Sequence, residues 1–88
     1  MNNQPTLHLR VLAPTSIIFD GAVRSVSAVN HVGPFDILPG HTNFFTLISG
    51  GNVMADKDGD QVVFEVQKGI LKVQEDSVTV YANVGTGR

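Results

Sequence analysis

The sequence predicts an all-β fold, either a sandwich of two facing sheets or a small barrel. Valine, a β-branched residue that favours strands, occurs at 13 of 88 positions, whereas the strong helix former glutamate occurs only as Glu65 and Glu75. Short segments of alternating apolar and polar residues are separated by turns rich in Gly, Asp and Pro. No segment has the period of an amphipathic helix, so we expect strands alone.

The N-terminal third is expected to contain three strands. Leu7, Leu9 and Val11 alternate with neighbours that are mostly polar, the period of two that is typical of a half-buried strand. Asp20-Gly21 is a strong hairpin signal. The expected strands are residues 7–12, 16–19 and 22–29. Neither face of segment 22–29 is cleanly apolar, which indicates a bulge or an edge position in the sheet.

Residues 32–42 combine two prolines, two glycines and a histidine with apolar side chains. Pro34 and Pro39 exclude a regular helix and a central strand, because proline lacks the backbone N–H donor. Phe35, Ile37 and Leu38 are too apolar for an ordinary solvated loop. The segment is therefore expected to be either a tight connection with its apolar side chains turned inward or a rigid recognition loop. The residues alone leave both open.

The rest of the chain predicts further strands joined by turns. Ser49-Gly50-Gly51 is expected to break one strand, and Lys68-Gly69 to turn the chain between two others. Lys57–Asp60 and Glu75-Asp76 are also expected turns, with Gly59 suited to positive φ. The expected strands are residues 44–48, which read as buried, then 52–56, 62–67, 70–74 and 78–81.

Composition limits the class of protein. We expect the 88 residues to form one domain, residues 1–88, and residues 83–88 to be a flexible tail. A net charge of −2 argues against nucleic-acid binding, and the chain has no cysteine for disulfides or thiolate metal sites. The polar start lacks the regions of a signal peptide, and no apolar run approaches the roughly 20 residues that span a bilayer. We therefore expect no insertion into a membrane.

Four motifs together resemble the epsilon subunit of F-type ATP synthases. They are Leu9-Arg10-Val11 followed by Phe19–Val26, the segment Gly33–His41, the segment Gly69–Val73 and the segment Asp76–Ala82. They occur in the family's order and spacing over nearly the whole chain. The resemblance implies a sandwich of two roughly five-stranded sheets. It also implies a noncatalytic rotor subunit of the central stalk that couples proton translocation to ATP synthesis or hydrolysis, without a cofactor.

The resemblance also implies partners and contact positions. The family's sandwich binds the gamma subunit on one side and the c-ring on the other, peripheral to the membrane, here at the cytoplasmic face of a bacterial inner membrane. Matching positions place Ala13, His41, Thr42 and Thr46 at the gamma interface. Matching positions likewise place His31, Val32, Gly33, Pro34 and Asp36 at the c-ring interface.

The sequence departs from the family pattern at three places. It ends at Arg88, where the family usually continues into two C-terminal helices, so inhibition of hydrolysis by such a hairpin is not expected. Asp36 replaces a typical glycine, a tolerable change even if that position requires positive φ. Asn43 replaces a frequent proline, which loosens the turn after His41.

The histidines raise a separate question. His8, His31 and His41 have no ligand spacing typical of a metal site, so a metal-dependent enzyme is the weakest interpretation. His8 is expected on a solvent-facing strand position, and His41 is expected either to fix its turn or to contact gamma; the two roles are compatible. If it contacts gamma, its titration near neutral pH would make docking pH-sensitive.

Other functional classes have little support in the residues. Asp56, Asp58 and Asp60 crowd one turn but do not follow the EF-hand spacing, which indicates a solvated hairpin tip. No nucleophile motif or phosphate-binding loop is present, so no catalysis by this chain is expected. A small-ligand-binding sandwich is the alternative to the rotor role, although the chain has no tryptophan and only one tyrosine, Tyr81, to line a site.

Overall fold

The computed structural model describes residues 5–40 and 43–82, and all the helix-or-strand structure in these residues is strand. No helix that could cross a membrane occurs in this part of the chain. The all-β prediction is confirmed. The strands are β1 (Leu7–Ala13), β2 (Ser16–Val23), β3 (Ser25–Asn30), β4 (Gly33–Ile37), β5 (Phe44–Lys57), β6 (Asp60–Gln74) and β7 (Ser77–Ala82).

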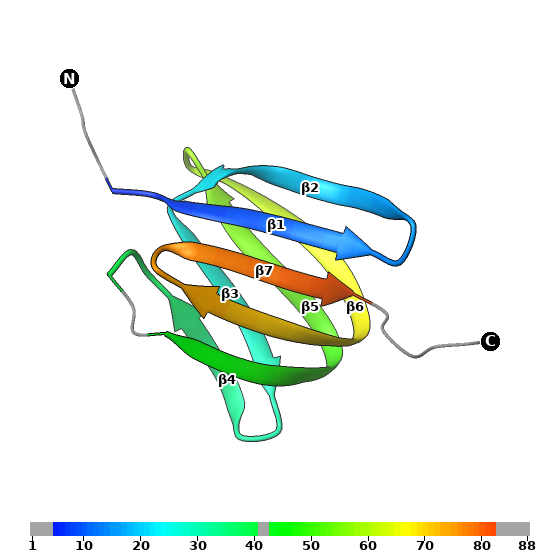
Figure 1. The fold of residues 1–88 in the computed structure, drawn as a ribbon. Coiled ribbons are helices and arrows are strands. Elements are labelled where there is room, and N and C mark those ends of the chain that lie inside the picture. The colour runs from blue at the N-terminus through cyan, green and yellow to red at the C-terminus, as the bar shows by residue number, and fades with distance from the viewer. Residues whose placement is uncertain (1–4, 41–42, 83–88) are drawn as a thin grey trace.

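The strands form one hydrogen-bonded sheet in the order β2-β1-β7-β6-β5-β3-β4, which folds over to make two layers (Figure 1). The two long strands β5 and β6 belong to both layers. Residues 69–74 of β6 pair with β7, whereas residues 54–56 of β5 pair with β3. We call layer A the strands β2, β1 and β7 with residues 69–74 of β6 and 44–48 of β5. Layer B is β3 and β4 with residues 51–57 of β5 and 60–66 of β6. The sandwich is therefore one folded sheet rather than two separate five-stranded sheets.

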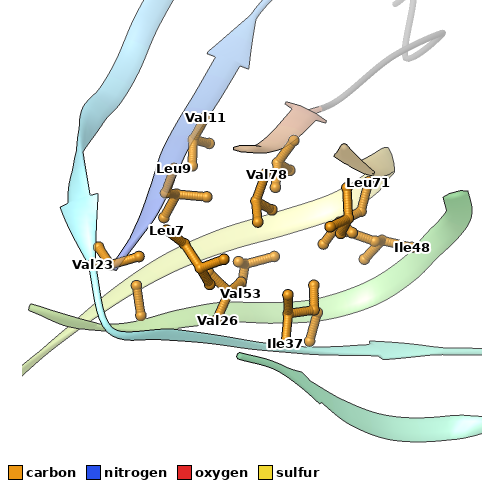
Figure 2. Close-up of a cluster of buried hydrophobic side chains, with 14 of the residues drawn as sticks. Leu7, Leu9, Val11, Val23, Val26, Ile37, Ile48, Val53, Leu71 and Val78 are labelled. Carbon is orange, nitrogen blue, oxygen red and sulfur yellow. The ribbon is translucent and has the colours of Figure 1, made fainter. Parts of the chain in front are cut away.

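The core lies between the two layers (Figure 2). Leu7, Leu9 and Val11 from layer A point toward Val26 and Ile37 from layer B. All five residues are fully buried, with 0% of their surface exposed. These residues alternate with exposed or half-buried neighbours along their strands, so the period-two pattern does mark the buried face. Burial of this apolar surface, at roughly 25 cal/mol per Å², is the main term that holds the layers together.

Glycines mark the places where β5 and β6 pass between layers. The predicted break at Ser49–Gly51 and the predicted turn at Lys68-Gly69 are both wrong, because β5 and β6 run through them in unbroken register. A Cβ on Gly69 would lie 2.5 Å from the carbonyl oxygen of Tyr81 in β7. Gly69 therefore permits a close backbone approach within a strand, which is the second common use of glycine in sheets.

The turn after the second strand was also misplaced. Asp20-Gly21 does not form a hairpin, since both residues lie inside β2 and pair with Arg10 and Leu9 of β1. The expected strand 22–29 is in fact the end of β2 and all but the last residue of β3, separated at Arg24. That change of strand explains why neither face of the segment was cleanly apolar, and β3 lies inside the sheet rather than at its edge. An irregular register does occur, between Val11 and Leu12 of the β1–β2 pair.

Residues 33–37 form β4, an edge strand whose one pairing partner among the described strands is β3. The expectation of a loop throughout residues 32–42 is therefore wrong for residues 33–37. The prediction that this segment is not a central strand is confirmed. Pro34 is tolerated because an edge strand has one side without ladder bonds. Ile37 is fully buried and Phe35 packs against the core, whereas Leu38 is 57% exposed. The apolar side chains are thus turned inward only in part.

Two predicted turns are confirmed. Asp58 and Gly59 connect β5 to β6 with φ of 53° and 88°, and Glu75 and Asp76 connect β6 to β7 with φ of 51° and 64°. Positive φ at both central residues is the geometry of a two-residue hairpin that matches strand twist. The tail at residues 83–88 lies outside the described residues.

Candidate functional site

The predicted c-ring residues gather at the tip of the β3–β4 hairpin. His31 and Val32 form its two-residue loop, and both side chains are exposed, Val32 at 83%. The amides of Val32 and Gly33 donate to Oδ1 of Asn30 at 2.9 and 3.3 Å. Gly33 has φ of 137°, a value that side-chain-bearing residues rarely adopt. The tip therefore presents an apolar side chain on a loop that Asn30 holds in one conformation.

The rest of this set lies along β4. Pro34 pairs with Val29 and is exposed. Asp36 pairs with Ser27, whose hydroxyl donates to Oδ1 of Asp36 at 2.7 Å. Asp36 adopts no positive φ, so the replacement of glycine at this position carries no backbone strain. Its exposed carboxylate keeps capacity to accept bonds from a partner.

The predicted gamma residues are divided by the fold. Thr46 of β5 lies beside the hairpin, where its Oγ1 accepts from Nδ2 of Asn30 at 3.0 Å. Ala13 is the half-buried last residue of β1, and β7 and β6 lie between it and β5. Three strand spacings of about 4.8 Å separate these positions by about 14 Å in the direction perpendicular to the strands of layer A. His41 and Thr42 lie outside the described residues, so their roles stay predictions.

The connection from β4 to β5 is tied to the β6–β7 turn on both sides of residues 41–42. The amide of Gly40 donates to Oδ1 of Asp76 at 2.8 Å. The amide of Glu75 donates to Oδ1 of Asn43 at 3.1 Å. Asn43, where the family often has proline, thus gains a contact that proline could not make. Sequence reasoning missed these contacts, because they join residues more than 30 positions apart.

Three further expectations can be compared with the structure. His8 is solvent-facing, as expected, and its Nε2 pairs with Oδ1 of Asp20 on the neighbouring strand. Asp56 and Asp58 belong to a solvated hairpin tip, in which Oδ1 of Asp56 accepts from the amide of Gly59 at 2.8 Å. Asp58 is also 3.7 Å from Arg24. In residues 5–40 and 43–82 no group of three acidic or histidine side chains could hold a metal ion.

Layer A has an exposed apolar side that sequence reasoning missed. Residues 44–48 were expected to be buried, but Phe45 is 65% and Leu47 62% exposed. Ile48 is buried and Phe44 packs partly against the core, so the strand alternates like the others. The run gave no signal of this kind, because four of its five residues are apolar and the one polar residue, Thr46, lies on the half-buried side.

Comparison with known proteins identifies the family. The sequence matches the family described as ATP synthase, Delta/Epsilon chain, beta-sandwich domain, over residues 6–86. The chain belongs to this family. It is 34% identical over 74 residues to the ATP synthase epsilon chain of Trichlorobacter lovleyi, which covers 84% of this chain and 54% of that protein. It is 36% identical over 80 residues to the epsilon chain of Legionella pneumophila strain Corby, covering 90% and 57%. The chain thus spans little more than half the length of these relatives.

Solved structures agree on the fold. A chain of the Euglena gracilis mitochondrial ATP synthase, in a structure of OSCP, F1 and c-ring, superimposes with a TM-score of 0.83 at 16% identity. It covers 92% of this chain and 53% of that one. A chain of the Tetrahymena thermophila mitochondrial ATP synthase central stalk and c-ring has a TM-score of 0.73 at 12% identity, covering 92% and 66%. At such identities the likeness describes the sandwich alone.

Proposed function

We propose that this chain is the sandwich domain of a noncatalytic central-stalk subunit that bridges the gamma subunit and the c-ring of an F-type ATP synthase. The observation that carries the proposal is the family match over residues 6–86, nearly the whole domain. The two bacterial relatives bear the name ATP synthase epsilon chain. The complex would lie at the cytoplasmic face of a bacterial inner membrane, with this domain peripheral to the bilayer.

The proposed mechanism is mechanical. A sandwich whose layers share two continuous strands resists sliding of one layer over the other, because β5 and β6 would have to break their hydrogen bonds. Such a body can transmit torque between two partners bound at different places. Stable interfaces of this kind bury at least about 1,200 Å² in total, so each partner needs a sizeable area of an 88-residue domain.

The two proposed contact areas consist of the residues that the family resemblance assigns to each partner. The exposed hairpin tip, with His31, Val32 and Gly33, and the adjoining Pro34 and Asp36 would meet the c-ring. An exposed charge pair made by Asp36 would add only about 0–1 kcal/mol, so shape and the Val32 side chain would contribute more.

The gamma contact is assigned to the connection between β4 and β5 and to two positions on layer A. They are His41, Thr42, Thr46 and Ala13. The contacts at Gly40 and Asn43 support this assignment, because they fix both ends of the segment that carries His41 and Thr42. Residues already held by hydrogen bonds, as Gly40 and Asn43 are, lose less entropy on binding than free ones do.

The test is calorimetric binding of this chain to the gamma subunit of the same complex, with His41→Ala and Val32→Ser variants. We expect one-to-one binding that His41→Ala weakens and Val32→Ser leaves unchanged, since Val32 is assigned to the c-ring. Binding that ignores His41→Ala would move the gamma contact elsewhere. Absence of any binding to gamma would contradict the rotor role.

A further inference from the structure

The outer side of layer B combines exposed apolar side chains with carboxylates. Met54 lies between two buried residues of β5, so it faces outward, and so does Asp56 two positions later. Met54 pairs with Val63 of β6, which is 51% exposed. Glu65, two residues after Val63, is exposed and faces the same side. We call Met54, Asp56, Val63 and Glu65 the layer B patch.

The patch lies on the acidic side of the domain. The described outward positions of layer B include no Lys or Arg and hold three carboxylates, those of Asp36, Asp56 and Glu65. The outer side of layer A, in contrast, carries Arg10 and Lys72 as well as Asp20. Negative charge is thus concentrated on the layer B side of a domain whose net charge is only −2. A surface with charge of one sign favours a partner of the opposite sign, so the patch is suited to a basic partner.

Glu65 differs from the other two carboxylates in its contacts. The hydroxyl of Ser27 donates to Asp36, and the amide of Gly59 donates to Asp56. Within residues 5–40 and 43–82 the side chain of Glu65 makes no hydrogen bond or ion pair. An exposed carboxylate in this state can accept two parallel hydrogen bonds from a guanidinium without giving up an existing contact.

The surface beside Glu65 is hollowed. Gly51, Asn52, Glu65 and Gln67 line a hollow of about 340 Å³, together with Val66. Asn52 pairs with Glu65 across the two strands, so a carboxylate and an amide lie side by side, and Gln67 adds a second amide. Gly51 has no side chain to fill the space. Carboxylate and amide oxygens are acceptors, which suit the five N–H donors of an arginine side chain.

We propose that the layer B patch binds a basic amphipathic helix of a partner protein, with one arginine guanidinium in the hollow against Glu65. Asp56 lies at the other end of the patch, because it pairs with Gln61, four residues and about 13 Å along β6 from Glu65. Two arginines eight residues apart on one helix face are separated by about 12 Å, so they reach both carboxylates. A leucine halfway between them lies over Met54 and Val63. The patch is defined without reference to the rotor role and includes none of the residues assigned above to gamma or the c-ring.

The probe is a synthetic helical peptide of about 13 residues that carries the two arginines and the leucine at this spacing. Two further peptides have lysine or glutamate in place of both arginines. We expect the arginine peptide to bind with amide shift changes confined to residues 51–56 and 61–67, and added salt to weaken this binding. The lysine peptide binds about threefold more weakly, because an ammonium group cannot form the paired bonds of a guanidinium. The glutamate peptide binds at least about tenfold more weakly than the arginine peptide.

Two pairs of variants locate the site. Glu65→Gln removes the carboxylate of the hollow, and Glu75→Gln removes the same charge from the exposed β6–β7 turn. Glu65→Gln lowers the affinity for the arginine peptide about tenfold, whereas Glu75→Gln leaves it unchanged. Val63→Ser weakens binding, whereas Leu47→Ser, which removes a similarly exposed apolar side chain from layer A, does not. None of the four side chains is in the core, so all four variants keep the wild-type amide spectrum elsewhere.

Several results would overturn the proposal. These are equal binding of the arginine and glutamate peptides, equal weakening by Glu65→Gln and Glu75→Gln, or no binding of the arginine peptide. Equal binding of the arginine and lysine peptides would overturn the assignment of the hollow to a guanidinium. None of these measurements contains gamma or the c-ring, so failure here and failure of the rotor role are separate outcomes.

Discussion

The β5–β6 pair and the edge strand β4 are held in opposite ways. β5 and β6 pair along nearly their full length and contribute to both layers. β4 has five residues, pairs with one neighbour, and buries a single side chain completely, Ile37. Yet β4 and its hairpin carry most of the predicted contact residues. The long pair therefore provides the rigid frame, while most of the proposed contact residues lie where strand pairing is least extensive.

The largest expected effect on stability comes from truncating one buried side chain of equal size to alanine in each region. Leu71→Ala in β6 should lower the free energy of unfolding by about 4 kcal/mol, because surrounding strands on both sides prevent the cavity from closing. Ile37→Ala in β4 should cost about 2 kcal/mol, since an edge strand can shift toward the cavity. Urea unfolding of both variants measures the difference. Equal costs would show that β4 is as rigid as the frame.

The second prediction concerns the closest backbone approach in the frame. Gly69→Ala places a Cβ 2.5 Å from the Tyr81 carbonyl oxygen, so we expect a loss of about 3 kcal/mol in urea unfolding. Gly21→Ala is the matched control, also within a strand, where the new Cβ would meet the flexible ring of Phe19 at 3.3 Å. That variant should cost less than about 1 kcal/mol. Similar losses of unfolding free energy for the two variants would mean that the β6 and β7 backbones can move apart to accommodate the new Cβ.

These two glycines also show where sequence reasoning fails. Gly69 follows Lys68 between two apolar runs and resembles a turn, while Gly21 follows Asp20 and resembles a hairpin. Neither has positive φ, and both lie inside strands. A local sequence pattern shows that a position requires glycine. It does not show whether the cause is a turn or the close approach of another strand's backbone. Where alternation was clear, as at Leu7–Val11, both the strand and its buried face were predicted correctly.

The candidate site was predictable only through the family resemblance. His31 and Val32 lie together at the hairpin tip, but this is no test of the prediction, because residues adjacent in sequence are always close in space. The contact from Asn30 to Thr46 joins the two layers and could not be read from one segment. The exposed apolar side of layer A could not be predicted for the same reason, because it requires the order of the strands to be known. Sequence pattern specifies the face of each strand but not which strand lies beside it.

The third prediction tests how the hairpin tip is held. Asn30→Ala removes the acceptor of two tip amides and the donor to Thr46, so it should cost about 1–2 kcal/mol. Amide hydrogen exchange should quicken at Val32 and Gly33 while the β5–β6 amides keep their protection. Asn52→Ala, at an exposed position of β5, is the control and should change neither value. Unchanged exchange at the tip would show that loop length alone sets its conformation.

The smallest expected effect lies at the other hairpin, between β5 and β6. Arg24 and Asp58 are 3.7 Å apart, but their side chains are 41% and 85% exposed, so water and salt screen the pair. Asp58→Asn should change the free energy of unfolding by less than about 0.5 kcal/mol at any salt concentration, and asparagine also tolerates the positive φ of this position. A loss above about 1 kcal/mol that disappears in high salt would show that this tip depends on the ion pair. The β5–β6 tip would then be stabilised by an ion pair in addition to its Gly59–Asp56 hydrogen bond, whereas the β3–β4 tip is held by the hydrogen bonds of Asn30.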